Sequence, residues 1–371
     1  MPPPSLVFVA GARPNFVKIA PVLRALARQR RFSDVLVHTG QHYDFALSGV
    51  FFEQLGIREP DVYLQVGSAS HGVQTGRIMA SFEEYLATLD ARPRGIVVVG
   101  DVNSTMACAL VGAKLGIPVA HVEAGLRSFD RAMPEEINRL VTDAVADLLL
   151  VSEPAGMTNL AREGVAAERI RYVGNVMIDS LVEQLPAARA LNSAAQLGLA
   201  RGAYALVTLH RPSNVDDPER LDALVQFLIR LSARLPVVFP VHPRTRAKLA
   251  DRGLVAQLER RPDIRLSSPL GYREFLGLME SARVVVSDSG GIQEETTFIG
   301  IPCITLRTST ERPVTVSQGT NVLVGEDLDA AWSAVDRVAS GEQNRRAPIE
   351  GWDGHAADRV ADVLSAAWGT S

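Results

Sequence analysis

The sequence predicts an α/β protein with two Rossmann-like domains, each a doubly wound parallel sheet. Short runs rich in Val, Ile and Leu alternate with amphipathic stretches of helical length, which is typical of parallel strands with helical crossovers. These runs are apolar nearly throughout, as in strands buried on both faces. The alternation occurs in two successive series, and 371 residues is a length typical of two or three domains.

The first series begins at the N-terminus with SLVFVAG and ends in DLLLVSE. Amphipathic stretches at 14–29 and 104–116 are examples of the helices expected between its strands. The predicted strands of this series are 5–11, 33–40, 95–101, 118–125 and 147–153.

The second series repeats the pattern after a join near 172–179. Its predicted strands are 169–175, 203–211, 236–242, 263–270, 282–288 and 301–307. Its clearest helical stretches are 218–235, 272–281 and 291–300, and GHAADRVADVLSAAWG predicts a last helix after a long polar segment.

Composition and charge exclude several classes of partner. Hydrophobic residues make up 47% and charged residues 22%, as in ordinary soluble globular proteins, and the net charge of −4 favours neither nucleic acid nor an acidic membrane. The only cysteines, Cys108 and Cys303, lie far apart, which indicates a reducing compartment. The N-terminus has no signal-peptide pattern and no apolar run is long enough to span a membrane, so we expect a cytoplasmic protein.

Polar and ionisable residues follow most of the predicted strands. In open parallel sheets, ligands bind outside the carboxyl ends of the strands, so these residues are the candidates for a site. They are Arg13, Lys18, Asp101 and Glu123 in the first series, and His210, Arg211, His242, Ser289, Gly290 and Gly291 in the second.

GARPNFVK, at 11–18, predicts a turn from a strand into a helix with Pro14 in its first turn. Arg13 and Lys18 then place two positive charges where a helix N-terminus already favours anions. Surface charge on a capped helix explains the stretch equally well, since no GxGxxG or P-loop pattern is present.

SDSGGIQEE, at 287–295, ends a predicted buried strand and begins a helix. Gly290 and Gly291 leave backbone N–H groups accessible, and the free N–H groups of a helix N-terminus suit a phosphate. Glu295 lies about one turn further along, where a carboxylate is placed to accept hydrogen bonds from ribose hydroxyls. A serine N-cap followed by acidic first-turn residues is the simpler alternative.

HVEAGLRSFDRAMPEEINR, at 121–139, contains more acids than a structural loop needs. Glu123 ends a buried strand, and Glu135 and Glu136 open a helix in which acids also complement the dipole. With Asp101, Glu123 and Glu135 make three carboxylates on neighbouring loops, and crowded carboxylates acquire separated pKa values that suit one acid and one base. Glu136 is the better candidate for a structural role.

Histidines in the sequence point to a ligand site more than to a metal. A lone histidine after a strand is most often structural, but His210 stands beside Arg211 at a strand end, which favours function. HTGQH, at 38–42, has no accompanying set of cysteine or carboxylate ligands, so no metal site is expected.

Eight motifs, taken together and in order, resemble the UDP-N-acetylglucosamine 2-epimerases of the non-hydrolysing, bacterial type. The resemblance covers residue 6 to about 324, and its specificity lies in the order of the motifs. The motifs are GARPNFVKIAPV, TGQHYD, VGDVNSTMACAL, HVEAGLRS, MPEEINR, YVGN, SDSGGIQEE and ERP.

The resemblance implies a GT-B fold, two Rossmann-like domains facing across a cleft. The first domain would be 1–172 together with the C-terminal helix at about 355–371, and 173–354 would be the UDP-binding domain. It further implies inversion at C2 of a UDP-linked N-acetyl sugar through loss of UDP and a 2-acetamidoglucal intermediate, with no cofactor, in a homodimer.

By match to the family motifs, the resemblance also assigns roles to residues. Asp101, Glu123, Glu135 and His210 correspond to catalytic residues. The residues implied to bind substrate are Arg13, Lys18, Arg211, His242, Phe275, Ser289, Gly290, Gly291, Glu295 and Arg312, with Phe275 near the uracil. In some members Gln41, His42 and Gln74 match residues near a second, activating UDP-GlcNAc.

The sequence departs from the pattern in two places. Leu270 stands where some members carry a glutamine that contacts the base, and 65–77 follows a branch distinct from the enteric members. Relatives on that branch also act on 2,3-diacetamido uronic acids. A hydrolysing epimerase, a GT-B glycosyltransferase and a silent nucleotide-sugar sensor are the alternatives, and the retained acids and histidine argue against the last two.

Overall fold

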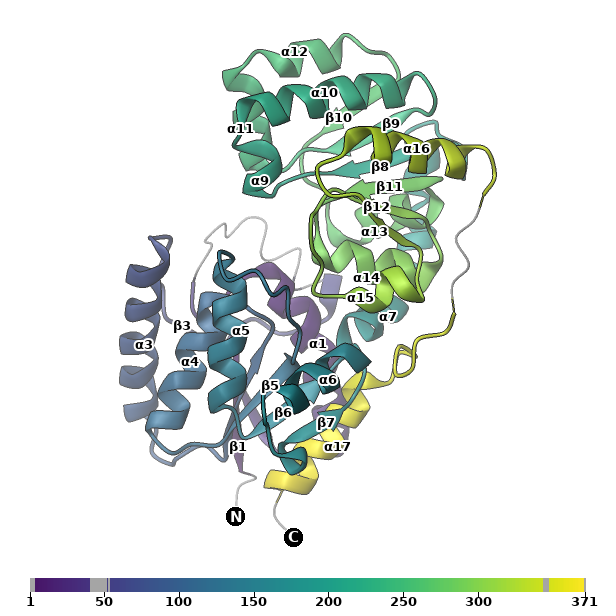
Figure 1. Cartoon of the computed structure of the whole chain (residues 1–371). Helices are drawn as coiled ribbons and strands as arrows, with labels where there is room; N and C mark the ends of the chain where they lie inside the picture. Colours follow the sequence, from purple (N-terminus) through teal and green to yellow (C-terminus); the bar gives the residue numbers. More distant parts are fainter. Residues whose placement is uncertain (1–3, 41–51, 53, 343–346, 370–371) are drawn as a thin grey trace. The chain divides into compact units, whose positions relative to one another are not determined.

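The computed structural model describes residues 4–40, 52, 54–342 and 347–369 (Figure 1). By its internal contacts the chain divides into two compact units. The first comprises Met1–Glu183 with Glu350–Ser371, and the second comprises Gln184–Ile349. The division falls inside one helix, α7 (Val176–Leu191).

The first unit is built on a parallel sheet with the strand order β3-β2-β1-β4-β5-β6-β7 in the described part of the chain. Strands β1, β4 and β5 are therefore neighbours, so the loops after them meet at one edge. The strands are β1 (Ser5–Ala10), β2 (Ser33–His38), β3 (Val62–Tyr63), β4 (Gly95–Val99), β5 (Val119–Ala124), β6 (Leu148–Val151) and β7 (Ile170–Tyr172).

Two features of this sheet differ from the sequence-based expectation. The prediction placed 169–175 at the head of the second series, but β7 pairs with β6 and forms the edge of the first sheet. Hydrophobic periodicity identifies a strand and carries no information on the sheet it joins. β3 was not predicted, because two residues are too few to show a period.

Helices cover the first sheet and bury its apolar strands. Valines and isoleucines of β1 and β4, such as Val7, Ile96 and Val98, form the core with residues of α3 and α4. The helices are α1 (Arg13–Gln29), α3 (His71–Ala87), α4 (Asn103–Lys114), α5 (Pro134–Val145), α6 (Pro154–Arg162) and α17 (Ala356–Trp368), with the 3-10 turn η1 (Ala167–Arg169).

The C-terminal helix α17 packs on α1, although hundreds of residues separate the two in sequence. Asp179 accepts hydrogen bonds from the backbone N–H groups of Ala356 and Ala357, the latter at 2.6 Å, and so caps α17. At the other end Trp368 lies directly against Gly95 at the start of β4, where a Cβ would overlap the indole ring. Figure 1 shows α17 beside the strands of the first unit.

The second unit repeats the architecture with the parallel order β10-β9-β8-β11-β12-β13 in the described residues. The strands are β8 (Ala205–Thr208), β9 (Val237–Pro240), β10 (Ile264–Ser267), β11 (Val284–Ser287), β12 (Cys303–Thr305) and β13 (Asn321–Leu323). β13 was not predicted from the sequence, because its three residues form no recognisable run.

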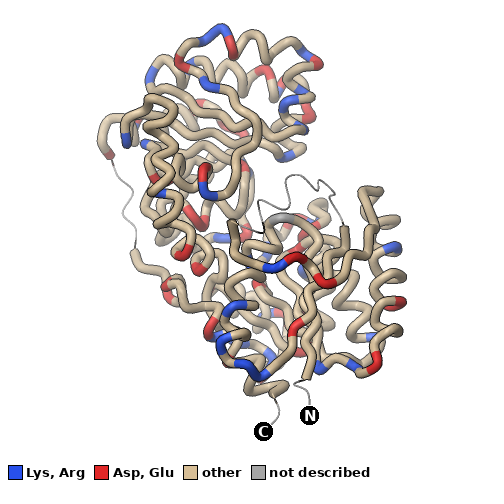
Figure 2. Tube along the Cα trace, turned by 180° about the vertical axis from the view of Figure 1, so that it is seen from behind, with Lys and Arg blue, Asp and Glu red and all other residues tan. Residues whose placement is uncertain are grey.

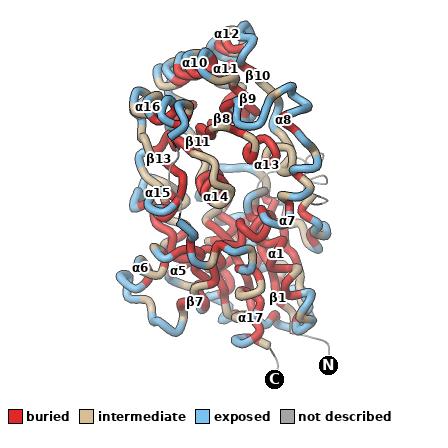
Figure 3. The backbone as a smooth tube through the Cα atoms, turned by 90° about the vertical axis from the view of Figure 1, so that its right-hand side faces the viewer, coloured by how far each residue is buried: buried red, intermediate tan, exposed pale blue. Residues whose placement is uncertain are grey.

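Helices of the second unit enclose a core of aliphatic residues, among them Val207, Leu224 and Val286. Figure 3 shows buried residues concentrated on the strands and on the helix faces against them. The helices are α8 (Ser193–Gln196), α9 (Pro212–Val215), α10 (Pro218–Ser232), α11 (Pro243–Asp251), α12 (Leu254–Glu259), α13 (Tyr272–Ser281), α14 (Gly290–Ile299), α15 (Pro313–Ser317) and α16 (Leu328–Ala339).

The charged residues of both signs are interspersed over helices and loops in each unit (Figure 2). No helix in the described residues is long and apolar enough to cross a membrane. The fold class expected from the sequence, α/β with two Rossmann-like doubly wound sheets, is confirmed.

The contact between Gly95 and Trp368 supports a stability prediction. Gly95→Ala will lower the free energy of unfolding by about 1–3 kcal/mol, the usual cost of overpacking a well-filled site. Urea denaturation of Gly95→Ala, Trp368→Ala and the double variant measures the coupling. The second substitution removes the obstructing ring, so Gly95→Ala should cost less in the Trp368→Ala background. Equal costs in both backgrounds would contradict the packing described.

Candidate active site

Glu123 lies at the carboxyl end of β5, in the first unit, and has an unusual backbone. Its φ is +74°, in the left-handed region, and the pairing of β5 with β6 shifts register between Val122 and Ala124. A residue other than glycine in that region costs about 1 kcal/mol or more and persists only where its surroundings impose it. Glu123 is nevertheless buried, and its carboxylate forms an ion pair with Lys18.

Lys18 reaches Glu123 from α1, the helix that follows β1. Asn15 fixes the start of that helix, because its side-chain oxygen accepts from the N–H groups of Gly11 and Ala12 at 3.1 and 3.0 Å and its amide donates to Val99 O at 2.9 Å. Asn15 thereby occupies the two N–H groups that the turn would otherwise offer an anion. Arg13 belongs to the same turn, and its side chain lies outside the described residues.

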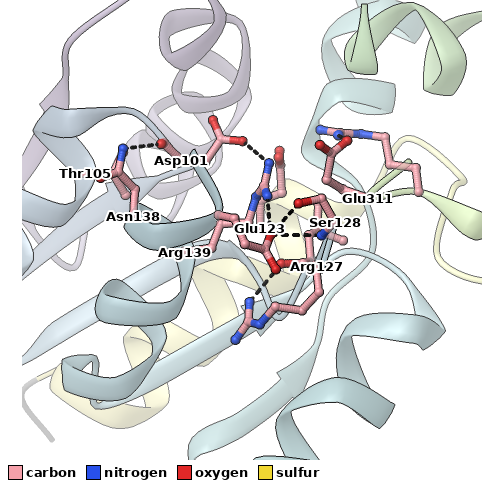
Figure 4. A network of polar contacts seen from close by, with 12 residues as sticks. Asp101, Thr105, Glu123, Arg127, Ser128, Asn138, Arg139 and Glu311 are labelled. Atoms are coloured by element: carbon pink, nitrogen blue, oxygen red, sulfur yellow. Dashed lines mark hydrogen bonds and ion pairs between the residues drawn. The ribbon is translucent and has the colours of Figure 1, made fainter. Parts of the chain in front are cut away.

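Asp101 follows β4 and faces a buried arginine that the sequence analysis did not single out. One nitrogen of the Arg139 guanidinium lies 2.7 Å from the Asp101 carboxylate and the other 2.7 Å from Glu136 (Figure 4). Asn138 donates to the backbone oxygen of Asp101 at 2.8 Å. The first turns of α5 therefore hold Asp101 through both its side chain and its main chain.

Glu136 and Glu135, adjacent in sequence, have different surroundings. Glu136 is buried and accepts hydrogen bonds from Ser128 N at 2.8 Å, Ser128 Oγ at 3.0 Å and Phe129 N at 3.0 Å. These bonds hold the loop after β5, in which Phe129 has a φ of +59° and is 75% exposed. Glu135 is half-buried, and its side chain makes no hydrogen bond or ion pair with the residues that the structure describes.

The three carboxylates predicted to form a cluster follow or end strands at one edge of the sheet, with Asp101 in the loop after β4, Glu123 at the end of β5 and Glu135 in the first turn of α5, and each has a distinct environment. Glu123 pairs with Lys18 and Asp101 with Arg139, while Glu135 is held by neither cation. Arg139 carried a weak signal in the sequence, since it stands three residues after Glu136, on the same helix face.

Gln74, expected beside a second nucleotide sugar, is a buried residue of α3. Its amide donates to Gly67 O at 3.0 Å, and its oxygen accepts from Asn103 at 2.8 Å. Asn103 in turn accepts from Asn138, which bonds the main chain of Asp101. Gln41 and His42, predicted with Gln74, lie outside the described residues.

In the second unit, His210 and Asp288 come together at the ends of the adjacent strands β8 and β11. The Asp288 carboxylate accepts from the backbone N–H groups of His210 and Arg211, the latter at 2.9 Å, and lies 3.1 Å from His210 Nδ1. Burial raises the pKa of Asp288, but His210 and these N–H groups outweigh burial and lower the pKa below its usual value. Asp288 is therefore a carboxylate that orients the imidazole.

The side chain of His210 is 37% exposed. His242 follows β9, and its ring centroid lies 5.6 Å from that of His210. Arg211 Nε donates to Asp288 O at 3.1 Å, so this arginine packs against the same strand end. The sequence analysis missed Asp288, although it stands at a strand end immediately before Ser289.

Ser289, Gly290 and Gly291 form the N-terminus of α14, as the sequence predicts. Arg312 lies against this end, because a Cβ on Gly290 would approach its guanidinium nitrogen to 2.8 Å. The Arg312 guanidinium is held by Glu294 at 2.9 Å and Glu311 at 3.4 Å, and Glu311 also pairs with Arg307. A Cβ at position 290 would require the guanidinium to shift away from the helix end.

Glu295 lies in the second turn of α14 and is buried. Burial raises its pKa to about 7, the charge of Glu294 adds to the rise, and a 2.8 Å hydrogen bond donated by Tyr272 opposes it. Phe275, predicted near a uracil, is half-buried one turn after Tyr272 on α13. In the residues described, no group of three or more His, Cys, Asp or Glu is arranged to hold a metal.

Comparison with known proteins gives the family. Residues 24–365 match the family described as UDP-N-acetylglucosamine 2-epimerase. The chain is 38% identical to a UDP-N-acetylglucosamine 2-epimerase of Methanococcus maripaludis, over 96% of this chain and 97% of that one.

The chain belongs to the UDP-N-acetylglucosamine 2-epimerase family. It is accordingly an epimerase, an isomerase that acts on carbohydrates, and the resemblance found in its motifs is confirmed.

Further relatives refine this placement. A UDP-2,3-diacetamido-2,3-dideoxy-D-glucuronate 2-epimerase of Pseudomonas aeruginosa is 40% identical, over 97% of this chain and 99% of its own. The crystal structure of Methanocaldococcus jannaschii UDP-GlcNAc 2-epimerase in complex with UDP-GlcNAc and UDP matches with a TM-score of 0.90 and 38% identity, covering 98% of this chain and 99% of that one. The expected GT-B type of fold is therefore confirmed.

The raised pKa of Glu295 gives a prediction for stability against pH. The folded-state pKa of about 7 exceeds the ordinary value of 4.5, so the folded protein holds the proton more tightly. This contribution to stability is fully present below pH 4.5 and is lost as the pH rises through 7, at up to about 1.4 kcal/mol per pH unit.

Glu295→Gln keeps an acceptor for Tyr272 and cannot ionise. Its stability relative to the parent protein should therefore improve steadily between pH 5 and pH 7.5. Urea denaturation followed by the fluorescence of Trp332, in the same unit, measures the difference. Tyr272→Phe serves as the matched variant. It removes the hydrogen bond that lowers the pKa of Glu295, so the pH range over which stability is lost should move to higher pH. Parallel stability curves for the parent and Glu295→Gln would refute the assignment.

Proposed function

We propose that the protein reversibly interconverts UDP-GlcNAc and UDP-ManNAc by inverting C2 of the sugar. The observation that carries the proposal is Glu123, a buried carboxylate held in left-handed backbone at a strand end of a UDP-N-acetylglucosamine 2-epimerase family member. The relative from Methanocaldococcus jannaschii, bound to UDP-GlcNAc and UDP, supports the choice of ligand.

In the forward direction the C2–H bond breaks and its proton passes to a carboxylate, while the C1–O bond breaks and its electrons leave with UDP. The electron pair of the C2–H bond becomes the C1=C2 double bond of 2-acetamidoglucal. UDP oxygen then attacks C1, and a second acid delivers a proton to the opposite face of C2. A C2–H beside an acetamido nitrogen is a weak acid, so the step requires a positioned base.

Asp101, Glu123 and Glu135 supply the acids and bases in this proposal. Two faces of C2 need two proton carriers, and the carboxylates of one sheet edge provide them. Lys18 and Arg139 keep Glu123 and Asp101 in fixed positions, which matters because proton transfer depends on geometry within a few tenths of an ångström.

UDP departs with negative charge on its phosphates, and the second unit offers groups that stabilise it. The N-terminus of α14, at Ser289, Gly290 and Gly291, presents backbone N–H groups to an anion. Arg312 is held against that helix end, and His210, oriented by Asp288, is placed near the departing phosphate. The remaining proposed ligand contacts are Arg13, Lys18, Arg211 and His242, with Glu295 at the ribose and Phe275 near the uracil.

A second candidate substrate is a UDP-2,3-diacetamido uronic acid, favoured by the 40% identity to the Pseudomonas aeruginosa enzyme named for it. A hydrolysing reaction that releases UDP and ManNAc is the alternative outcome with the first substrate. A homodimer without a cofactor and a second nucleotide sugar near Gln41, His42 and Gln74 remain expectations from the family resemblance, and the cytoplasm remains an expectation from the sequence.

Proton NMR in deuterated water distinguishes these outcomes. With UDP-GlcNAc we expect deuterium at C2 together with UDP-ManNAc, because the abstracted proton exchanges with solvent before it returns. Free UDP with ManNAc as the only sugar product would indicate hydrolysis. Deuterium incorporation only into the diacetamido uronic acid nucleotide would change the substrate, and no incorporation into either would refute the proposal.

Glu123→Gln tests the carboxylate itself. We expect the rate of deuterium incorporation at C2 to fall at least about 10³-fold, since the amide cannot accept the proton, while UDP binding by calorimetry changes little. Glu183→Gln is the matched control, because Glu183 also pairs with a cation of α1, in this case Arg24, but at a 44% exposed site. Comparable activity in the two variants would exclude Glu123 from catalysis.

A further inference from the structure

Three buried residues, His121, Arg127 and Asp143, form a polar network around the end of β5, where Glu123 lies, and Glu163 joins it from an exposed position. Two of them, His121 and Arg127, flank Glu123 on β5 and the loop after it. Asp143 reaches them from α5, and Glu163, after α6, completes the set by pairing with Arg127 at 2.7 Å. None of the four was singled out by the motif analysis.

Asp143 lies at the centre of this network and is almost fully buried. One carboxylate oxygen lies 2.6 Å from His121 Nδ1. The other accepts from Gly125 N at 3.0 Å and lies 2.7 Å from an Arg127 guanidinium nitrogen. Burial raises the pKa of Asp143, but His121 and Arg127 outweigh burial and lower it, so the group is a carboxylate.

Both ring nitrogens of His121 have polar partners inside the protein. Its Nε2 lies 2.8 Å from Gly100 O, a carbonyl that only accepts, and its Nδ1 faces the carboxylate of Asp143. The side chain is 0% exposed. Both nitrogens are engaged inside the protein, so His121 has neither a free nitrogen nor a path to exchange a proton with a substrate.

The bonds from Asp143 and His121 fix the main chain on both sides of the candidate active site. Gly125, two residues after Glu123, has a φ of +80° and packs so closely on Gly156 that a Cβ would lie 2.6 Å from its oxygen. Gly100 immediately precedes Asp101 and is also bonded through its N–H to Val122 O. One carboxylate thus links the backbone beside Glu123 to the backbone beside Asp101.

We propose that Asp143 is a positioning residue for the epimerase reaction. It imposes the left-handed conformation of Glu123 and fixes the position of Glu123 relative to Asp101. Left-handed backbone at a glutamate is unfavourable and needs compensating contacts. The N–H of Gly125 and the side chains at 121 and 127 provide them, all converging on one buried anion. The proposal rests on the proposed function only in the roles given to Glu123 and Asp101.

Asp143→Asn tests this with little change in volume. The neutral amide leaves the buried Arg127 without one of its two carboxylates and no longer holds His121 and Gly125 through one anion, so the loop should lose its fixed geometry. We expect kcat to fall at least about 30-fold while KM and the Kd for UDP stay within threefold, because the loop is displaced and UDP contacts are not.

Asp147→Asn is the matched control. Asp147 accepts from Val119 N at 2.8 Å at the opposite end of the same strand, so it makes a similar carboxylate bond to the backbone of β5 far from Glu123. Its loss should change stability and leave kcat unchanged. Equal kcat in Asp143→Asn and Asp147→Asn would overturn the proposal.

Two further measurements do not depend on activity. Nitrogen-15 NMR of labelled histidine should show a hydrogen bond at His121 Nδ1 in the parent protein and a changed one in Asp143→Asn. A crystal structure of the variant should show Glu123 outside the left-handed region. An unchanged φ at Glu123 would refute the positioning role even if no UDP-sugar were converted, whereas a parent protein inactive on every UDP-sugar tested would refute the proposed function alone.

His121→Gln is the second variant, in case Asp143→Asn does not fold. The glutamine amide donates to only one of the two acceptors, Gly100 O or Asp143, so it weakens the link between the two loops. Asp143 keeps a cationic partner, because Arg127 remains. A smaller loss of kcat, about 5- to 10-fold with unchanged KM, is expected. Full activity in this variant would contradict the link through Gly100.

Discussion

The ion pair between Lys18 and Glu123 is the contact on which the polar edge of the first unit depends. Both side chains are buried, so neither charge is compensated by water. Removing one partner from a buried pair typically costs 3–5 kcal/mol, because the other charge is left uncompensated. The pair therefore ties α1 to the end of β5. Together with the pair of Arg139 and Asp101, it supplies the positive charge that stabilises carboxylates at this edge.

The parallel sheet explains why these groups are found together at all. Its strands are buried on both faces, so polar side chains are excluded from the strands and collect where the strands end. Only β4 separates β1 from β5 in the sheet, so a lysine of the helix after β1 can reach an acid at the end of β5. The same rule brings His210 to Asp288 across β8 and β11 in the second unit.

The sequence predicted much of this arrangement, and its omissions have a common cause. Strand-end residues such as Asp101 and His210 were recognised because each stands beside an apolar run that the sequence shows directly. Their partners, Arg139 and Asp288, were not recognised as partners, because a pairing across loops depends on strand order, which periodicity does not give. The misassignment of β7 has the same cause. The sequence shows that a strand is present there, but not which strand it pairs with.

Two histidine–aspartate pairs in this chain show why residue type alone does not assign a role. In both, a buried aspartate lies against Nδ1 of a histidine near a strand end and also holds a backbone N–H of the adjoining loop. His121 spends its second nitrogen on Gly100 O and is fully buried, so it can fix the main chain but cannot exchange a proton with a ligand. His210 keeps its second nitrogen at a 37% exposed site. The surroundings of that second nitrogen therefore separate a histidine that only fixes the main chain from one whose side chain reaches the surface.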